Sequence, residues 1–410
     1  MGAFTWGSDA HLDWLARYRE QLLDFYQPHV VDPRGGYFWL GNTGTPMPEK
    51  GKELWIAARM VHAFSLASLW GREGAADVAA HGVRYLGTAP GRDTEHGGWF
   101  TGIHPDGRDD SKQLYGMAHV VLSGSSAVAA GIGGGRALLD EAVALIDEHY
   151  WDDAAGAGLD VMDRAFTRAD PYRGLNANMH LTEAYLAAFE ATGQTRLLDR
   201  AVRMAERFAR DPLASGERGA HRLVEHFDER WRPVPDYNRD EPAHPFRPYG
   251  STPGHWLEWA KLCVQIAGLR PEVDWLLPAA RQLFDGAVDD AWADGGGFYY
   301  TVDWDGAPVI SSRYFWPVAE AIGAAHVLRL ATGEQRYADA YERFWRFADA
   351  HLMDHEHGAW HSELDDDLRP IARTWDGKPD LYHVLQATLY AKLPMERGLA
   401  ARLRDEAGNS

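Results

Sequence analysis

The sequence contains a single cysteine, Cys263, so it can form no internal disulfide bond. Its apolar runs are interrupted by charged residues or glycine, and none reaches the ~20 residues that a membrane-spanning helix needs. The first residues, Met1 to Trp6, include neither the basic segment nor the apolar segment of a signal peptide. Together these absences predict a cytoplasmic protein without a membrane partner.

Basic residues are also scarce, since 41 Lys and Arg face 60 Asp and Glu and the net charge is −19. That balance argues against nucleic acid or an acidic membrane surface as a partner. The length of 410 residues exceeds a usual single core, which leaves two domains or one large toroid or barrel. The 17 Trp and 17 Tyr suit either a large core or a cavity that binds carbohydrate.

A glycine-containing marker followed by aromatic or alternating residues recurs along the chain. Neighbouring markers lie about 60 residues apart, except for one spacing of nearly 80 before the fifth, and a repeated period predicts a repeat architecture. Turn residues bound each marker, so each is predicted to form a short β-hairpin. The markers occupy residues 35–39, 97–100, 156–161, 219–224, 296–300 and 358–361.

Between the markers the apolar pattern is helical and predicts twelve helices in six pairs. Such pairs bury their apolar faces only by stacking side by side, so the chain is expected to form an all-α (α/α)6 barrel with short linking β-hairpins. We expect one catalytic domain over residues 1–410, with a long, proline-rich loop insertion at about 212–252 that is a candidate lid. The helices are predicted at 8–28, 51–70, 73–88, 112–132, 135–149, 172–192, 195–211, 253–270, 272–290, 312–332, 335–351 and 379–393.

Alternate helices of such a barrel form an inner ring and run parallel, so their first turns converge at one mouth. Polar and aromatic residues recur near those first turns, which predicts one shared cavity. The last inner helix is predicted to begin at Pro379, with Asp380 in its first turn. The residues at these positions are Trp55, Arg59, Tyr115, Asn176, His180, His255, Glu258, Trp316, Glu320 and His383.

Histidines in this arrangement favour proton transfer near neutral pH. His255 and His180 each precede a glutamate by three residues, which predicts that Glu258 and Glu183 orient the two imidazoles. The other interpretation is an ordinary ion pair on a helix face, and a lone histidine in a helix is more often structural.

A metal centre is the main alternative for so many histidines, but the sequence supports it poorly. It contains no His-Glu-x-x-His, and Pro242 disfavours a helix at Glu241 to His244. The histidines near the last hairpin, at 355, 357 and 361, could bind zinc adventitiously. The sequence also lacks the Gly-x-Ser-x-Gly motif that would indicate a nucleophilic serine. We therefore expect no metal and no cofactor.

The ordered set of motifs resembles the N-acylglucosamine 2-epimerase superfamily over nearly the whole chain. The ending Lys378-Pro379-Asp380-Leu381-Tyr382-His383 is most similar to the aldose–ketose isomerase branch, which includes mannose isomerase and sulfoquinovose isomerase. The other motifs that carry the resemblance are Trp55/Arg59, Tyr115, Asn176/His180, Pro253-Gly254-His255-Trp256-x-Glu258 and Trp316-x-x-x-Glu320.

This resemblance implies metal-free interconversion of D-mannose and D-fructose, and of D-lyxose and D-xylulose, through a cis-enediol. It implies that His255 and His383 are the acid/base pair. The expected partner is a free monosaccharide, and the expected assembly is a monomer or a homodimer. The predicted substrate-binding residues are Trp55, Arg59, Tyr115, Asn176, His180, Arg247, Glu258, Trp316, Glu320, Trp375 and Asp380.

The residues fit this chemistry independently, because a base near neutral pH can remove the proton beside a carbonyl and a cation can stabilise the enediolate. The same two histidines also suit a sugar 2-epimerase of the N-acylglucosamine or cellobiose type. A sulfoquinovose isomerase would need a cationic pocket, for which Arg247 or Arg59 is available. A glycoside hydrolase of the same fold would need two carboxylates across the cavity, such as Glu258 and Glu320.

Overall fold

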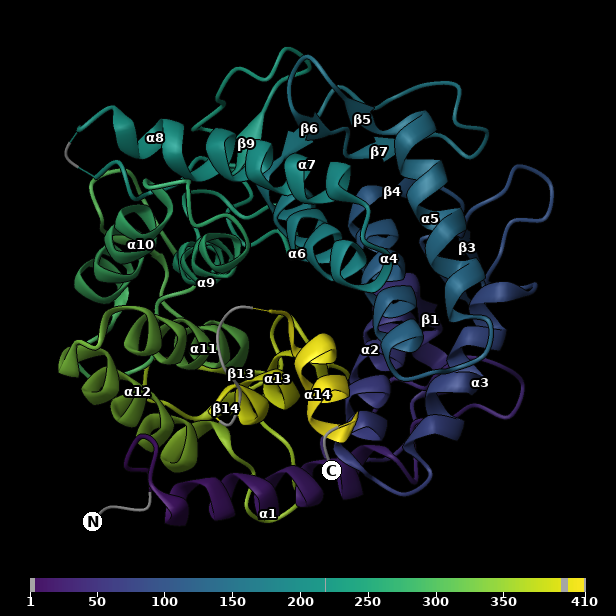
Figure 1. Ribbon diagram of the computed structural model, residues 1–410, viewed down its shortest axis with the longest axis horizontal. Helices are drawn as coiled ribbons and strands as arrows, with labels where there is room; N and C mark the ends of the chain where they lie inside the picture. Colours follow the sequence, from purple (N-terminus) through teal and green to yellow (C-terminus); the bar gives the residue numbers. More distant parts are fainter. Residues whose placement is uncertain (1–3, 218, 392–396, 409–410) are drawn as a thin grey trace.

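The computed structural model describes residues 4–217, 219–391 and 397–408. These residues form two concentric rings of helices, as Figure 1 shows, so the predicted (α/α)6 barrel is confirmed. The inner ring consists of α2 (Leu54–Trp70), α4 (Leu114–Ala129), α6 (Leu175–Thr192), α9 (Pro253–Leu269), α11 (Phe315–Thr332) and α13 (Tyr382–Tyr390). The outer ring consists of α1 (Asp9–Tyr26), α3 (Ala75–Gly87), α5 (Gly135–His149), α7 (Thr195–Ala205), α10 (Leu276–Ala291) and α12 (Gln335–Phe347).

The two rings differ in their sequence pattern because they differ in burial. Each inner helix packs between two inner neighbours, and α13 contacts α2 to close the ring. In α2 every residue from Leu54 to Ala67 is buried, so the helix has no solvent-facing stripe. The outer helix α7 instead buries Leu197, Ala201 and Met204 at helical spacing, and the charged residues between them are exposed or only partly buried. Within the described residues, no helix is long and apolar enough to cross a membrane.

The structure corrects the ends of several predicted helices. The last inner helix begins at Tyr382, and Pro379 lies outside it. Asp380 precedes this helix, and its Oδ1 accepts a hydrogen bond from the backbone N–H of Tyr382 at 2.9 Å. Residues 392 and 393 of the predicted helix lie outside the described residues. A further helix, α14 (Leu399–Gly408), was not predicted, and it packs across the ring against α2, α4 and α6.

Two outer helices extend beyond their regular α-helical part. Helix α7 continues through a π-helical turn, Glu206–Arg210, into α8 (Asp211–Ala214), and α12 continues through another, Ala348–Leu352. The predicted ends of these helices, at 211 and 351, therefore fall within the extensions.

Short strands fasten the inner helices to one another at one mouth of the barrel. The strand that enters an inner helix pairs antiparallel with the hairpin of the following repeat, as in Lys52 opposite Ile103 and Arg313 opposite Leu364. This pairing fixes the first turns of neighbouring inner helices relative to one another. The sheets are β1 (Lys52–Glu53), β2 (Gly102–His104) and β3 (Gly107–Asp109); β4 (Lys112–Gln113) and β7 (Val161–Met162); β5 (Trp151–Asp152) and β6 (Ala157–Gly158); β8 (Arg173–Gly174) and β9 (His226–Phe227); β10 (Thr301–Val302) and β11 (Pro308–Ile310); and β12 (Arg313–Tyr314), β13 (Glu363–Leu364) and β14 (Pro370–Ile371).

The described residues of the long segment after α8 are irregular apart from β9, but they are held by hydrogen bonds. The ring of His226 bonds the hydroxyl of Tyr172 and the carbonyl of Pro248, each at 2.8 Å. The side-chain amide of Asn238 donates to the carbonyl of Arg247 at 2.7 Å. These bonds hold the segment at the mouth of the barrel, where Phe246 lines the candidate site.

Candidate active site

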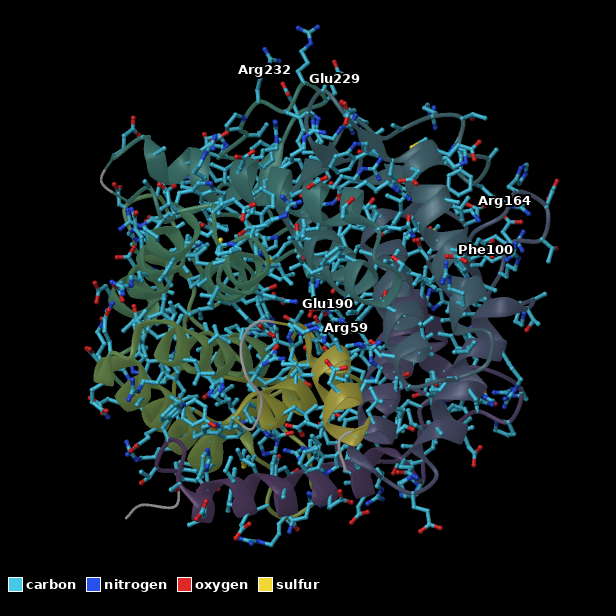
Figure 2. All side chains as sticks on the ribbon, in the orientation of Figure 1. Arg59, Phe100, Arg164, Glu190, Glu229 and Arg232 are labelled. Carbon is cyan, nitrogen blue, oxygen red and sulfur yellow. The ribbon has the colours of Figure 1, made fainter. Side chains whose placement is uncertain are left out.

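A cavity of about 610 Å³, including its opening to solvent, lies where the first turns of the inner helices converge. Figure 2 shows Arg59, one of its lining residues, near the centre of the ring, whereas Arg164 and Arg232 lie at the rim. Most of the predicted site residues therefore meet in one place. Those that line the cavity are Trp55, Arg59, Tyr115, Asn176, His180, His255, Glu258, Trp316, Trp375, Asp380 and His383.

His255 is held by a carboxylate that the sequence analysis did not identify. Its Nδ1 lies 2.9 Å from Oε2 of Glu225, which precedes β9. The other oxygen of Glu225 accepts the backbone N–H of Thr252 at 3.2 Å. A carboxylate only accepts hydrogen bonds, so Nδ1 of His255 carries the hydrogen and Nε2 is left as a proton acceptor. The expectation that Glu258 orients His255 is therefore wrong, because Glu225 occupies Nδ1.

His383 is held in the same way by Glu320, at 2.7 Å between Nδ1 and Oε1. The second oxygen of Glu320 bonds the ammonium of Lys261, and all three side chains are buried. Burial alone would raise the pKa of Glu320, but Lys261 and His383 lower it to about 2. Glu320 is thus an ionised acceptor, and Nε2 of His383 is the proton-accepting nitrogen.

Arg59 brings a positive charge into the cavity and is held from three sides. Its guanidinium donates to Oδ2 of Asp380 at 2.6 Å, to the hydroxyl of Tyr115 at 3.0 Å and to Nε2 of His119 at 2.9 Å. It also lies over the ring of Tyr382, 4.5 Å from the centroid. Burial opposes the charge, but Tyr115 and Asp380 together hold the pKa of Arg59 above its usual value.

The two histidines beside Arg59 are neutral. Burial first and Arg59 second lower the pKa of both His119 and His180 well below the usual range. Nδ1 of His180 lies 3.9 Å from Oε2 of Glu183, beyond hydrogen-bond distance, and it has no hydrogen-bond partner within the described part of the chain. The predicted support of His180 by Glu183 is therefore absent, because the carboxylate of Glu183 instead accepts the hydroxyl of Tyr382.

Two further polar groups are available to a sugar. Burial and the neighbouring Glu320 raise the pKa of Glu258 well above its usual value, which favours the protonated form of this carboxyl group, and that form can donate a hydrogen bond. Oδ1 of Asn176 is buried, has no hydrogen-bond partner among the residues that the structure describes, and can accept a hydrogen bond. The arrangement therefore offers both donors and acceptors to hydroxyl groups.

Aromatic side chains form the walls of the cavity. Trp316 lies against both catalytic candidates, with ring centroids 5.3 Å from His255 and 5.7 Å from His383. Phe246, from the long loop, packs edge-on against Trp55 and Trp375, at 6.1 and 5.5 Å. A flat sugar face can pack on such rings while the polar groups bind its hydroxyls.

Two predicted contacts do not line the cavity. Arg247 stacks on the ring of Tyr172, 3.8 Å from its centroid, and Glu320 lies behind His383. Glu225, Lys261 and Phe246 are functional candidates that the sequence analysis missed. Glu225 directly follows the fourth glycine marker, which is the only local signal that could have identified it.

Among the described residues, one group offers three possible metal ligands whose atoms lie within 4.8 Å of one another: Glu258, Glu320 and His383. Glu320 is already engaged by Lys261 and His383, and the ammonium of Lys261 would repel a cation at this position. These donors therefore suit an internal ion-pair network better than a metal ion.

Comparisons with known proteins show which proteins and which family the chain is similar to. A D-mannose isomerase of Thermobifida fusca is 44% identical over 96% of this chain and 97% of its own length, and one of Pseudomonas cannabina pv. alisalensis is 40% identical over 97% and 96%. A crystal structure of D-mannose isomerase superposes with a TM-score of 0.88 at 32% identity, covering 96% of this chain and 99% of that one. The model of the N-acylglucosamine 2-epimerase family matches residues 35–387. The chain therefore belongs to the N-acylglucosamine 2-epimerase family.

Proposed function

We propose that this enzyme is an aldose–ketose isomerase that interconverts D-mannose and D-fructose through a cis-enediol. The observation that carries the proposal is the pair of imidazoles, His255 and His383, that face one sugar-sized cavity with Nε2 available for proton transfer. The similarity to proteins named D-mannose isomerase supports this choice of substrate. D-lyxose and D-xylulose, which have the same configuration around the reacting carbons, are proposed as a second pair.

In the proposed reaction His255 assists ring opening. Nε2 of His255 takes the proton of the anomeric hydroxyl while a donor returns one to the ring oxygen, which exposes the aldehyde. Glu225 stabilises the imidazolium that forms, because its carboxylate is hydrogen-bonded to Nδ1. Glu258, in its protonated form, is the donor on the same helix that faces the cavity.

His383 then moves the proton between the two carbons. Nε2 of His383 removes the proton from C2 and returns it to C1 on the same face of the enediol, while O1 gains and O2 loses a hydroxyl proton. Negative charge develops on these oxygens, and Arg59 and His180 are the proposed stabilising groups. Trp55, Tyr115, Asn176, Trp316, Trp375 and Asp380 are proposed to position the sugar, and Arg247 remains a prediction that requires its side chain to leave Tyr172.

The alternatives fit these contacts less well. A sulfonated sugar needs surplus positive charge, but Arg59 is already neutralised by Asp380 and Arg247 does not line the cavity. A glycosidase needs two carboxylates facing the bond that is cleaved, but Glu320 is behind His383. A 2-epimerase uses the same histidines and differs only in the carbon and face that receive the proton.

Proton NMR of D-mannose incubated with the purified enzyme and EDTA in D₂O tests the proposal. Growth of fructose signals with deuterium at C1 is the expected result, and activity in EDTA supports a reaction without metal. Glucose deuterated at C2, without fructose, would establish a 2-epimerase instead. Unchanged mannose would overturn the proposed substrate.

The assembly, the location and the extent of the catalytic unit are also proposals. We infer one catalytic domain over residues 1–410, because α1 and α13, from the two ends of the chain, pack together and complete the rings. Sedimentation will distinguish the proposed monomer from a homodimer. Fractionation of the source cells will test the proposed cytoplasmic location.

A further inference from the structure

Lys261 reaches the catalytic candidate His383 through one carboxylate. It lies on α9, its side chain is 6% exposed, and its ammonium bonds Oε2 of Glu320 on α11. Oε1 of the same carboxylate accepts Nδ1–H of His383 on α13 at 2.7 Å. Three inner helices thus each supply one member of a continuous chain, and only its last member lines the sugar cavity.

The charge of Lys261 decides which form of Glu320 is stable. Glu320 is 1% exposed, so burial favours its protonated form. Lys261 offsets this effect, because its buried ammonium bonds Glu320 directly. Without it, the pair Glu320–His383 would retain an additional proton at neutral pH.

An additional proton on the Glu320–His383 pair would prevent His383 from acting as a base. A protonated Glu320 donates to Nδ1 of His383, which forces the hydrogen of the neutral imidazole onto Nε2. An Nε2–H group faces the sugar as a donor and cannot remove a proton from carbon. A histidine that is bonded to a protonated acid is therefore in the wrong tautomer.

We propose that Lys261 is a positioning residue for the reaction: it keeps Glu320 ionised, and Glu320 thereby keeps Nε2 of His383 free to accept the proton of C2. The inference rests on the proposed function for the identity of the transferred proton. Lys261 touches no substrate in this scheme, because it faces away from the sugar cavity.

Lys261 faces a second chamber, which makes its charge experimentally accessible. This chamber, of about 700 Å³ including its opening to solvent, lies under α14, and none of its described lining residues is shared with the sugar cavity. Among the described residues, Nε2 of His62 and Nε2 of Gln386 are buried there without hydrogen-bond partners, so the mainly apolar chamber contains polar groups that a ligand could bind. The titratable and charged groups around Lys261 and its chamber are His62, Glu183, Glu190, Glu258, Glu320, Tyr390, Arg402 and Arg404.

The first test is Lys261→Met in the full-length enzyme. We expect kcat for D-mannose to fall by about 100-fold at pH 7, within the range of acid–base catalysis, with a change of less than about threefold in KM. The acid limb of the pH profile of kcat/KM should move upward by about one pH unit or more, because the buried Glu320–His383 pair must lose its extra proton first. Lys261→Arg should restore the wild-type limb.

A matched control separates this effect from simple loss of a buried lysine. Lys112 is equally buried and pairs with Asp93 at 3.1 Å, away from both cavities. Lys112→Met should lower the melting temperature without moving the acid limb. A folded Lys261→Met variant with a wild-type kcat and an unmoved limb would overturn the proposal.

Chemical rescue and NMR add independent readouts. In Lys261→Ala, propylammonium should enter the chamber and restore part of kcat, while propanol of similar size should not; equal effects of both would contradict a role for the charge. Imidazole ¹⁵N shifts of His383, assigned with His383→Asn, should change from the Nδ1–H to the Nε2–H tautomer in Lys261→Met. This measurement needs no turnover, so it decides the inference even if D-mannose is not the substrate.

Discussion

At the scale of single residues, the site is built from histidines whose second nitrogen is occupied. His255 bonds Glu225 and His383 bonds Glu320, and each carboxylate comes from a different segment than its histidine. In this orientation Nδ1 of each ring is hydrogen-bonded, and Nε2 of each ring is available to a molecule in the cavity. An imidazole held in this way loses little orientational freedom when it reacts, and its imidazolium form is stabilised by the carboxylate.

Replacing Glu225 by Gln should remove the negative charge that stabilises the imidazolium form of His255. An amide can still accept or donate at Nδ1, but it no longer stabilises the imidazolium, so we expect kcat to fall by about 10-fold to 100-fold with a smaller change in KM. Steady-state kinetics with D-mannose measures this effect. Glu229→Gln, an exposed position of the same loop, is the control and should behave as wild type. Equal kinetics for the two variants would remove Glu225 from the mechanism.

At the scale of elements, buried lysine–aspartate pairs tie hairpins to the starts of inner helices. Lys112 bonds Asp93 and the carbonyl of Gly97, and Lys378 bonds Asp354 and the carbonyl of Gly358 in the same pattern. Lys378, the first residue of the motif that ends at His383, therefore stabilises the fold. Its partners show that Lys378 fixes the segment before α13 to the last hairpin.

Lys378→Met should destabilise the fold, because it leaves Asp354 buried without its cation. Loss of one partner of a buried pair typically costs about 3–5 kcal/mol, so we expect a clear fall in the urea midpoint. The comparison variant is Lys50→Met, which breaks the more exposed pair with Asp376 and should change stability by less than about 1 kcal/mol. Similar losses in both variants would contradict the structural role of Lys378.

The long loop contributes one aromatic side chain to the cavity, and this makes its role testable. Phe246 is 40% exposed and contacts Trp55, Tyr115 and Trp375. Phe246→Ala should remove about 1 kcal/mol of aromatic contact and raise KM about fivefold with little effect on kcat. Initial rates over a range of D-mannose concentrations provide the test. A lower kcat with an unchanged KM would instead assign the loop to a step after binding.

At the scale of the whole molecule, buried carboxylates make the barrel sensitive to acid. Burial alone would raise the pKa of Asp32, Asp93 and Asp354, but their bonds to Arg and Lys side chains and backbone N–H groups lower it below the ordinary value. A carboxylate with a lowered pKa in the folded state stabilises that state above its unfolded pKa. This contribution is lost as the pH falls toward the folded pKa.

We therefore expect the urea midpoint to fall steadily below about pH 5, since unfolded aspartates titrate near 3.9. Urea unfolding followed by circular dichroism at several pH values measures this slope. Asp93→Asn should be less stable than wild type at pH 7 and should lose less stability on acidification. The same acid slope in both proteins would show that Asp93 does not contribute.

The sequence by itself determined the repeat and the ring of polar groups. Helical periodicity, glycine breaks such as Thr192–Gly193 and recurrent hairpin markers are local signals, and they predicted the helices of both rings and the place where His255 and His383 lie. These features depend on residues that are close in the chain. The unpredicted helix α14 carries no marker of the repeat, which explains why it was missed.

Only the tertiary structure decided which side chains support the histidines. The i, i+3 spacing predicted Glu258 for His255, but the partner is Glu225, 30 residues away, and Glu320 reaches His383 across 63 residues. Such pairs form where inner helices and loops of different repeats pack together, so the distance between two side chains is unrelated to their spacing in the chain. The same packing places Lys261 behind Glu320, where its ammonium pairs with the carboxylate that bonds His383 on another helix.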